Sequence, residues 1–436
     1  MSQADWDRLQ YYSRRVKFFK NTNQRDNDPN QPQVHPSTYI RITQLQSSAL
    51  FPSLRHLEYN LNDGNVSHIF LFLSPLLDML TFHNIGGFEN AIVEPFLATL
   101  SSKSQMLTRI FLHSGKISVD NLKNSIVHFK QLRSLEFDCI QVPTSNFALW
   151  EVLGTLPSLA NLSVKYSKFV SHPMHAPEKS NSQSGGPKYF EVLESLCVTG
   201  SGSFFQVFIQ HLLGIIDSPC LESIKVSDWQ VQVNNELEPE GLITSSMMII
   251  ASKWSQSLKI LDIYSNWRSM NTPNGNAISK CLALLTVLQE MQTFHLAGWR
   301  MENIDDDVRR LLISWPKLRT LGLHYIGNQF ISLSTLRIIA ENCPGLRDLI
   351  IQLDTSTIPP FDTSSKSLCH NLEVLIVRKV RPPSTQTTVT LEHQIQVTRH
   401  LDLIFPYLIS INVWDEPWKG ICDLFKLCQD ARRVTT

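Results

Sequence analysis

The stretch Trp315–Asp354, WPKLRTLGLHYIGNQFISLSTLRIIAENCPGLRDLIIQLD, begins and ends with the same apolar phrase. The phrase is LRTLGL at 318–323 and LRDLII at 346–351, so apolar residues alternate as they do along a half-buried β-strand. Between the two copies, Ser334–Asn342 has the apolar spacing of a helix and a serine that can cap its first turn. Pro344 ends this helix, because proline lacks the N–H and disfavours helix in the residue before it. One strand and one helix therefore recur within about 28 residues.

The same phrase can be followed along most of the chain. Its thirteen copies start at Leu54, Leu77, Leu107, Leu132, Leu159, Leu193, Leu221, Leu258, Met291, Leu318, Leu346, Leu372 and Leu408. A single copy is a weak signal, because any half-buried strand produces it, and unrelated strands of an ordinary α/β fold are the alternative interpretation. Thirteen copies in series, most of them preceded by a helical stretch, predict an α/β leucine-rich-repeat solenoid. We expect a horseshoe of about 13 strand–helix repeats with a parallel concave sheet.

Four segments follow from this pattern. Residues 1–20 are predicted to form an N-terminal helix, and residues 21–38, rich in Asn and Pro, a polar linker. The leucine-rich-repeat solenoid is expected over residues 39–414. Residues 415–436 are predicted to form a C-terminal capping helix, because the last repeat of a solenoid must be covered. The apolar face of this helix is expected to hold Trp418, Ile421, Leu424, Phe425 and Leu427.

The charges of the chain balance, with 39 Lys and Arg residues against 39 Asp and Glu residues. This balance gives no electrostatic reason to expect nucleic acid or a membrane surface as a partner. The eight cysteines are scattered, and we interpret them as thiols in a reducing compartment rather than as a disulfide framework. The polar start of the chain is not a signal peptide, and no apolar run reaches the ~20 residues of a membrane span. We therefore expect a cytoplasmic or nuclear protein.

Several repeats resemble those of a known family. Cys343-Pro-Gly-Leu-Arg-Asp-Leu349 is similar to the cysteine-containing repeat of fungal-type F-box/leucine-rich-repeat proteins, which have an RNI-like solenoid. The Pro-containing turns before other copies are similar to those of that family: Phe51-Pro-Ser-Leu54, Leu156-Pro-Ser-Leu159 and Trp315-Pro-Lys-Leu318. The segment Trp6–Val16 resembles the one that follows the F-box in these proteins. The resemblance implies a non-catalytic protein-binding scaffold, similar to the substrate-recognition part of an F-box ubiquitin-ligase receptor.

The chain departs from that family because no F-box is recognisable in it. In the family, the F-box docks on the adaptor subunit of a cullin–RING ligase. We therefore expect the adaptor as a partner only if an F-box is supplied elsewhere, and residues 1–436 alone should not bind it. The alternative is a free-standing leucine-rich-repeat interaction scaffold unrelated to ubiquitination.

No catalytic, cofactor-binding or metal-binding residues are predicted. His172-x-x-His175 and Cys369-His370 carry metal-ligating atoms, but no second pair stands at zinc-finger spacing. Asp305-Asp306-Asp307 opens a predicted helix, where carboxylates favour the positive end of the helix dipole. No phosphate-binding glycine motif is present. The sequence thus predicts no cofactor and does not indicate an enzyme.

The remaining candidate is the concave face of the sheet. The middle residue of each phrase should point away from the core. These residues are Glu58, Thr81, Phe111, Glu136, Ser163, Cys197, Lys225, Asp262, His295, Gly322, Ile350, Ile376 and Asn412. Aromatic and imidazole groups gather late in the series, at Tyr264, His295, His324 and Tyr325. Because such side chains often anchor interfaces, we expect a protein partner to bind the concave face there.

Overall fold

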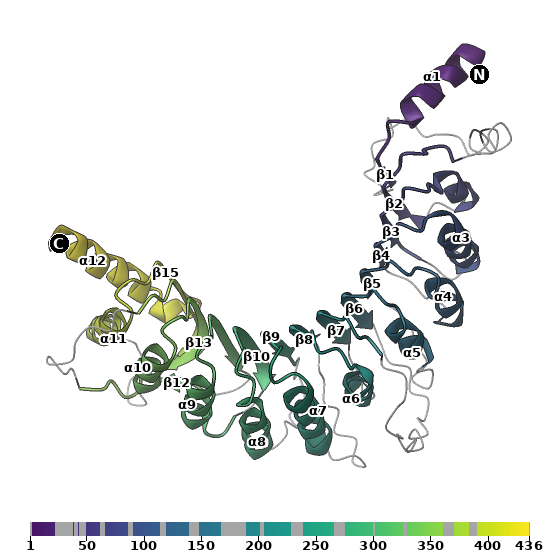
Figure 1. The fold of residues 1–436 in the computed structure, drawn as a ribbon. Coiled ribbons are helices and arrows are strands. Elements are labelled where there is room, and N and C mark those ends of the chain that lie inside the picture. The colour runs from purple at the N-terminus through teal and green to yellow at the C-terminus, as the bar shows by residue number, and fades with distance from the viewer. Residues whose placement is uncertain are drawn as a thin grey trace. The chain divides into compact units, whose positions relative to one another are not determined.

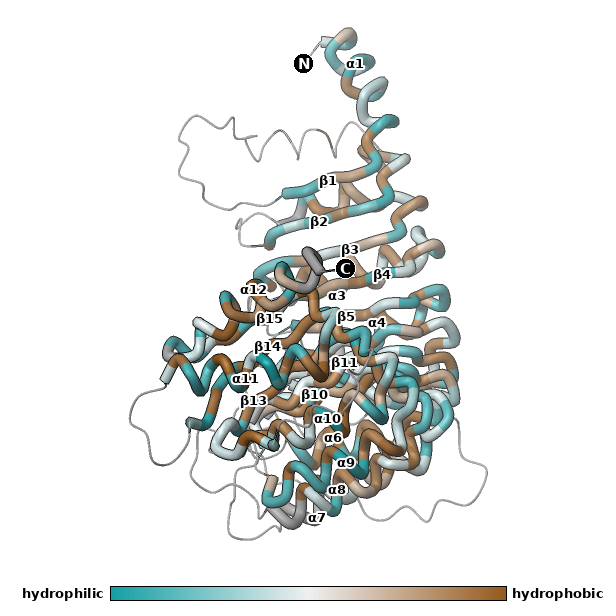
Figure 2. Tube along the Cα trace, turned by 90° about the vertical axis from the view of Figure 1, so that its left-hand side faces the viewer, coloured by the Kyte–Doolittle hydropathy of each residue, from teal (hydrophilic) through white to brown (hydrophobic). Residues whose placement is uncertain are grey.

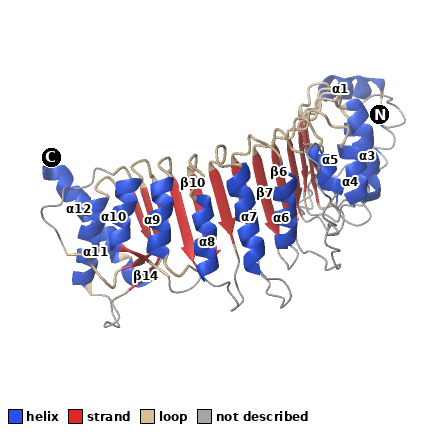
Figure 3. Ribbon diagram, turned by 60° about the horizontal axis from the view of Figure 1, so that its bottom comes forward, coloured by secondary structure: helices blue, strands red, loops and turns tan. Residues whose placement is uncertain are grey.

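A computed structural model describes most of the chain. The described residues are 2–21, 38, 42, 49–61, 66–85, 90–113, 119–138, 148–166, 189–200, 205–227, 239–265, 275–299, 301–325, 329–360, 370–382 and 390–435. They form two compact units, Met1–Leu221 and Glu222–Thr436. In each unit, parallel strands lie side by side in chain order and the repeat helices cover one face of the sheet (Figures 1 and 3).

The first unit contains seven of the strands. They are β1 (Phe18–Asn21), β2 (His56–Asn60), β3 (Met79–His83), β4 (Arg109–Leu112), β5 (Ser134–Asp138), β6 (Asn161–Tyr166) and β7 (Ser195–Gly200). Its helices are α1 (Gln3–Ser13), α3 (Asn90–Lys103), α4 (Val119–Ile126), α5 (Ala148–Gly154) and α6 (Phe205–Ile215), with a 3-10 helix η2 (Val66–Phe72).

The second unit repeats this plan. Its strands are β8 (Ser223–Ser227), β9 (Ile260–Tyr264), β10 (Thr293–Trp299), β11 (Thr320–Tyr325), β13 (Asp348–Asp354), β14 (Val374–Arg381) and β15 (Ser410–Val413), and the short β12 (Ile331–Ser332) pairs with β13. Its helices are α7 (Pro239–Lys253), α8 (Gly275–Leu285), α9 (Ile304–Ser314), α10 (Leu333–Asn342), α11 (Leu391–Ile404) and α12 (Gly420–Thr435), with the 3-10 helix η3 (Glu416–Trp418). The predicted leucine-rich-repeat fold is confirmed.

The core of each unit lies between the sheet and its helices. Within the phrase, the first apolar residue and the two strand residues that follow it point inward. Leu346, Leu349 and Ile351, for example, have no exposed surface. In Figure 2, hydrophilic and hydrophobic residues alternate along the helices and strands. This alternation is expected when one face of each element packs in the core and the other faces outward.

Successive repeats are joined by a recurring hydrogen-bond pattern, which we call the shared-carbonyl ladder. The carbonyl oxygen after the first leucine of one phrase accepts two consecutive N–H groups from the next copy. Arg55 O, for example, accepts Asp78 N at 2.8 Å and Met79 N at 3.0 Å. The acceptors are Lys17, Arg55, Asp78, Thr108, Arg133 and Ala160 in the first unit, and Glu222, Lys259, Gln292, Arg319, Arg347 and Glu373 in the second. Because a carbonyl oxygen has two lone pairs, this pattern leaves neither N–H unpaired.

Buried polar side chains reinforce the turns that precede the strands. Ser104 Oγ donates to Ser74 O, Ser218 Oγ donates to Leu193 O at 2.7 Å, and His370 Nε2 donates to Cys343 O at 2.8 Å. Each bond reaches a backbone carbonyl of the preceding repeat. These side chains therefore add a second link between neighbouring repeats, beside the ladder.

The N-terminal prediction was wrong in part. The helix predicted for residues 1–20 ends at Ser13, and Phe18–Asn21 forms β1, which pairs in register with β2. Val16 starts a further copy of the phrase, because Lys17 O accepts two consecutive N–H groups at the start of β2, as the other ladder carbonyls do. Phe19 takes the place of the strand leucine in this copy, because it pairs with Leu57 and its ring centroid lies 4.3 Å from that of Phe72. The repeats thus begin at Val16 rather than near residue 39.

The C-terminal segment packs where a cap was expected. Trp418, Ile421 and Phe425 are buried as η3 and α12 pack beside α11 and β15. Leu427, which was expected on the same apolar face, is 63% exposed. The residues predicted to form the linker, apart from Asn21 and Thr38, lie outside the described residues.

Leu346→Ala should lower the free energy of unfolding by about 2–5 kcal/mol, because it removes methyl groups from a fully packed site and leaves a cavity. Urea unfolding, followed by far-UV circular dichroism, measures this loss. The control is Leu427→Ala, at a largely exposed leucine. A loss for Leu346→Ala no larger than that for Leu427→Ala would contradict the assignment of this position to the core.

Candidate partner-binding surface

In each unit, the face of the sheet opposite the helices carries the residues that the phrase places outward; we call it the open face. The pairing follows the alignment expected from the sequence. The middle residues pair as Glu58, Thr81, Phe111, Glu136, Ser163 and Cys197 in the first unit, and as Lys225, Asp262, His295, Gly322, Ile350, Ile376 and Asn412 in the second. Two of them, Thr81 and Gly322, are buried rather than exposed. The open face therefore consists of columns of register-paired residues, most of which are at least partly exposed.

Two of the four residues predicted to form a binding patch have described side chains. Tyr264, at the end of β9, is 45% exposed. His295, on β10, is half-buried and is the register partner of Asp262. His324 and Tyr325 lie in β11, where they pair with Ala297 and Trp299, but their side chains lie outside the described residues. Tyr264 and His295 therefore lie on neighbouring strands of the open face.

The absence of a side chain at Gly322 shapes this part of the surface. A Cβ atom at Gly322 would come within 2.3 Å of His295 Cδ2, so the imidazole occupies the space that a side chain would need. His295 Nδ1 lies 3.7 Å from Asp262 Oδ2. The imidazole is thus held between a carboxylate on one strand and a bare backbone on the other.

A second group of imidazoles lies on the open face of the first unit. His83 and His113, on β3 and just after β4, stack with ring centroids 5.1 Å apart and an interplanar angle of 14°. Phe111 lies parallel to His113, at a centroid distance of 6.3 Å. His56 packs edge-on against Phe18 of β1, also at 6.3 Å. These side chains form an aromatic and imidazole surface that was not predicted from the sequence.

Glu58 contacts both a lysine and a histidine on this surface. Its carboxylate lies 2.8 Å from Lys20 Nζ and 3.1 Å from His83 Nε2. Burial by itself raises the pKa of Glu58, but the hydrogen bonds and charges of Lys20 and His83 outweigh it, so the pKa of Glu58 lies below its usual value. The carboxylate is therefore ionised at neutral pH and holds three strands together on the open face.

This surface was not predicted, because only the middle column of the phrase was compared along the whole series of repeats. His83 and His113 occupy the next outward column, directly after the second strand hydrophobic residue, where Tyr264 also stands. The same column holds Asp138 and Lys165, whose charged groups lie 3.2 Å apart. Reading both columns would have brought the two histidines together on neighbouring strands.

Of the four His and Cys residues considered as metal ligands from the sequence, only His370 lies among the described residues. Burial raises the pKa of the Cys343 thiol to about 12, so it stays protonated at neutral pH. His370 is buried and bound to the backbone, while His172, His175 and Cys369 lie outside the described residues. Within the described ranges, no three His, Cys, Asp or Glu side chains are grouped closely enough to hold a metal ion.

The three consecutive aspartates lie in the first turn of α9, as expected. Asp307 is buried, accepts a hydrogen bond from Ser279 Oγ at 2.6 Å and pairs with Arg310. Asp305 accepts the N–H of Ser332 at 3.2 Å. These carboxylates therefore connect α9 to neighbouring elements of the repeats.

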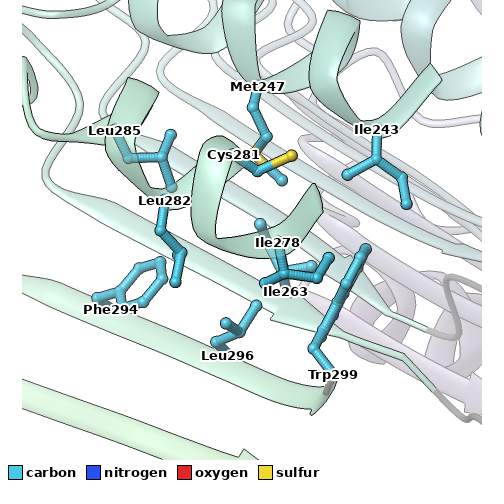
Figure 4. A pocket seen from close by; sticks show the side chains of 10 residues that line it. All are labelled: Ile243, Met247, Ile263, Ile278, Cys281, Leu282, Leu285, Phe294, Leu296 and Trp299. Carbon is cyan, nitrogen blue, oxygen red and sulfur yellow. The ribbon is translucent and has the colours of Figure 1, made fainter. Parts of the chain in front are cut away.

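A small apolar cavity lies between helices α7 and α8 and strands β9 and β10 of the second unit (Figure 4). It is lined by Met247, Ile263, Cys281, Leu282 and Trp299, among others, and its volume is about 10 Å³. A space of this size holds about one water-sized sphere, and its apolar walls offer that water no hydrogen bonds. It is a packing gap in the core and is too small for an organic ligand.

Glu58→Gln should lower the free energy of unfolding at neutral pH by up to about 1 kcal/mol, the scale of a partly exposed ion pair. The pKa of Glu58 is depressed in the folded state, so its carboxylate adds stability above the unfolded-state pKa and loses that contribution as pH falls through the folded-state pKa. The difference between wild type and variant should therefore shrink between about pH 5 and pH 3. Urea midpoints across this range measure it, and a difference independent of pH would refute the assigned role.

Comparisons with known proteins return solved structures whose sequences differ greatly from this chain. No family model matches the chain, and no curated protein matches its sequence. Solved structures that match include an internalin from Listeria monocytogenes, with 14% identity, a TM-score of 0.40 and 88% of this chain aligned to 92% of that one. A chain of the yeast Rad7–Elc1 complex matches with 15% identity and a TM-score of 0.38, over the same shares of both chains. At these identities and scores, the likenesses add nothing about function.

In the part of the chain that the structure describes, no helix is both long and apolar enough to cross a membrane.

Proposed function

We propose that this chain is a protein-binding leucine-rich-repeat scaffold that contacts its partner through the open face of the sheet. The observation that carries the proposal is the exposure of Tyr264 beside the half-buried His295–Asp262 pair on neighbouring strands. Tyrosine and histidine combine apolar area with a polar tip, which suits them to protein interfaces. Parallel strands in register also present an extended surface, as repeat scaffolds need.

The proposed site extends from Tyr264 and His295 to His324 and Tyr325, whose strand β11 adjoins β10 in register. An extended face of this kind fits a polypeptide better than a small molecule, because small ligands need a concave pocket that encloses most of their surface. The proposal is therefore non-catalytic binding of a protein partner.

The more specific role that we propose is substrate recognition for a ubiquitin ligase. Its support is the resemblance of Cys343–Leu349 and of the Pro-containing turns to the repeats of F-box proteins. In that role, the open face would hold the substrate, and an F-box supplied elsewhere would bind the ligase adaptor. A free-standing scaffold with the same open face and no connection to ubiquitin is the second candidate.

Tyr264→Ala combined with His295→Ala should remove bound partners without unfolding the chain, because both side chains lie on the open face. Affinity capture from an extract of the source cells, quantified by mass spectrometry against the wild type, measures the loss. The double variant should recover the specific partners at about one tenth of the wild-type level or less, which corresponds to about 1.4 kcal/mol of binding free energy.

The matched control is Val287→Ala with Ile313→Ala, which truncates two exposed apolar side chains on the helix side of the same unit. This control should retain the partners. If a folded Tyr264→Ala/His295→Ala variant recovers the same proteins as the wild type, the binding surface lies elsewhere.

Residues 1–436 alone should not retain the adaptor subunit of a cullin–RING ligase in a pull-down with purified proteins. The reason is that α1 is a single helix of 11 residues on which only Ser13 is buried, and so short a helix offers no stable domain surface. Recovery of the adaptor at stoichiometric levels would contradict this expectation. A fusion of a known F-box to the same residues serves as the positive control.

A further inference from the structure

Two consecutive cations lie together on the open face of the second unit. The pairing of β14 with β13 shifts by one residue at Arg378, which forms a β-bulge. In a regular strand, consecutive side chains point to opposite faces, but a bulge redirects them. Both Arg378 and Lys379 are exposed as a result. With Arg381 near the end of the same strand, they form what we call the β14 basic cluster.

Aromatic rings support all three cations. The guanidinium carbon of Arg378 lies 4.5 Å from the ring centroid of Trp414, which is 57% exposed. Arg381 and Lys379 lie over the ring of Phe330, at 4.4 Å and 5.8 Å. A ring face orients a cation without neutralising it, and a stacked guanidinium keeps its N–H donors free in their own plane. The cluster is therefore arranged in advance for oxygen anions.

The carboxylates near the cluster are engaged with other groups. Asp354 pairs with Arg381 at 3.1 Å, and Asp415 accepts the N–H of Val380 at 3.2 Å. Among the described residues, no carboxylate oxygen lies within 4.0 Å of the charged groups of Arg378 and Lys379. Within the described ranges, these two positive charges thus have no counter-charge at the surface, although the chain as a whole is neutral.

We propose that the β14 basic cluster binds an acidic segment of a partner protein, which rests on the proposed protein-binding function. One carboxylate accepts two hydrogen bonds from the guanidinium of Arg378, since this fork matches a carboxylate in shape. A second carboxylate pairs with Lys379, and an apolar residue of the segment packs on the exposed part of Trp414.

The observations favour a protein segment over nucleic acid. Binding along a nucleic-acid backbone needs a row of cations that follows successive phosphates. The β14 basic cluster is short, and Asp354 and Asp415 lie beside it. The outward residues that precede it on β13 and β14 are Ile350 and Ile376, which carry no charge. The cluster therefore fits a few carboxylates within an otherwise apolar contact.

The test uses a dye-labelled peptide that contains consecutive glutamates followed by leucine, with fluorescence anisotropy as the readout. The full chain should bind this peptide, and the same peptide with glutamine in place of glutamate should bind at least about tenfold more weakly. Arg378→Gln combined with Lys379→Gln should weaken binding of the glutamate peptide by a similar factor. Arg378→Lys, which keeps the charge but loses the fork, should have an intermediate effect.

The control is Lys317→Gln with Arg337→Gln, which removes two exposed cations that already pair with Glu290 and Glu341. This variant should bind the peptide as the wild type does, and thermal unfolding verifies that each variant is folded. Equal affinity for the two peptides, or unchanged binding by the Arg378→Gln/Lys379→Gln variant, overturns the proposal. Tighter binding of a single-stranded DNA oligonucleotide through the same two residues would also overturn it, in favour of nucleic acid.

These outcomes are separable from those of the proposed function. The variants of the peptide assay leave Tyr264 and His295 unchanged, and the variant of the capture experiment leaves the β14 basic cluster unchanged. Suppose that the glutamate and glutamine peptides bind equally well, but the Tyr264→Ala/His295→Ala variant still loses its partners. This result would refute the acidic segment and leave the proposed function intact. Specific peptide binding without any partner loss in the Tyr264→Ala/His295→Ala variant would refute only the position of the proposed binding face.

Discussion

The shared-carbonyl ladder is the constraint on which the rest of each unit depends. A parallel sheet has no hairpin turns to fix its register, so the alignment of neighbouring strands must be set in another way. Here one backbone carbonyl receives two N–H groups of the next repeat. This bond pattern does not require any particular side chain at the acceptor position, which is Lys, Arg, Asp, Thr, Ala, Glu or Gln in different copies. The phrase can therefore vary greatly while the geometry is kept.

Because the register is fixed, residues at equivalent positions of successive repeats line up in columns on the surface. Residues at the same phrase position in adjoining repeats become neighbours on the open face, and cross-strand pairs of this kind interact directly. Lys20 and Glu58 meet in this way on neighbouring strands, as do Asp262 and His295. His83 reaches Glu58 diagonally, from the next outward position on β3. Bulges add a second source of variation, since they place two outward side chains where a regular strand places one.

The fold could be predicted from the sequence because leucine at the inward positions leaves a strong periodic signal. The copy at Val16 could not be predicted, because it has Val, Phe and Asn at those positions. It is also separated from the next copy, at Leu54, by a long stretch of sequence. At the surface, the columns were predictable, and they brought Tyr264 and His295 to the same face. The β-bulge at Arg378 was not, because it depends on backbone geometry rather than on residue type.

The contact between Gly322 and His295 has an evolutionary consequence. Because the imidazole fills the space above the glycine, a side chain cannot be gained at position 322 while the ring at position 295 keeps its place. The two positions, which belong to adjoining repeats, are thus expected to change together in descendants of this sequence. A lineage that acquires alanine or serine at the first should also carry a smaller residue at the second, and the outline of the open face would then differ between relatives that share every core leucine.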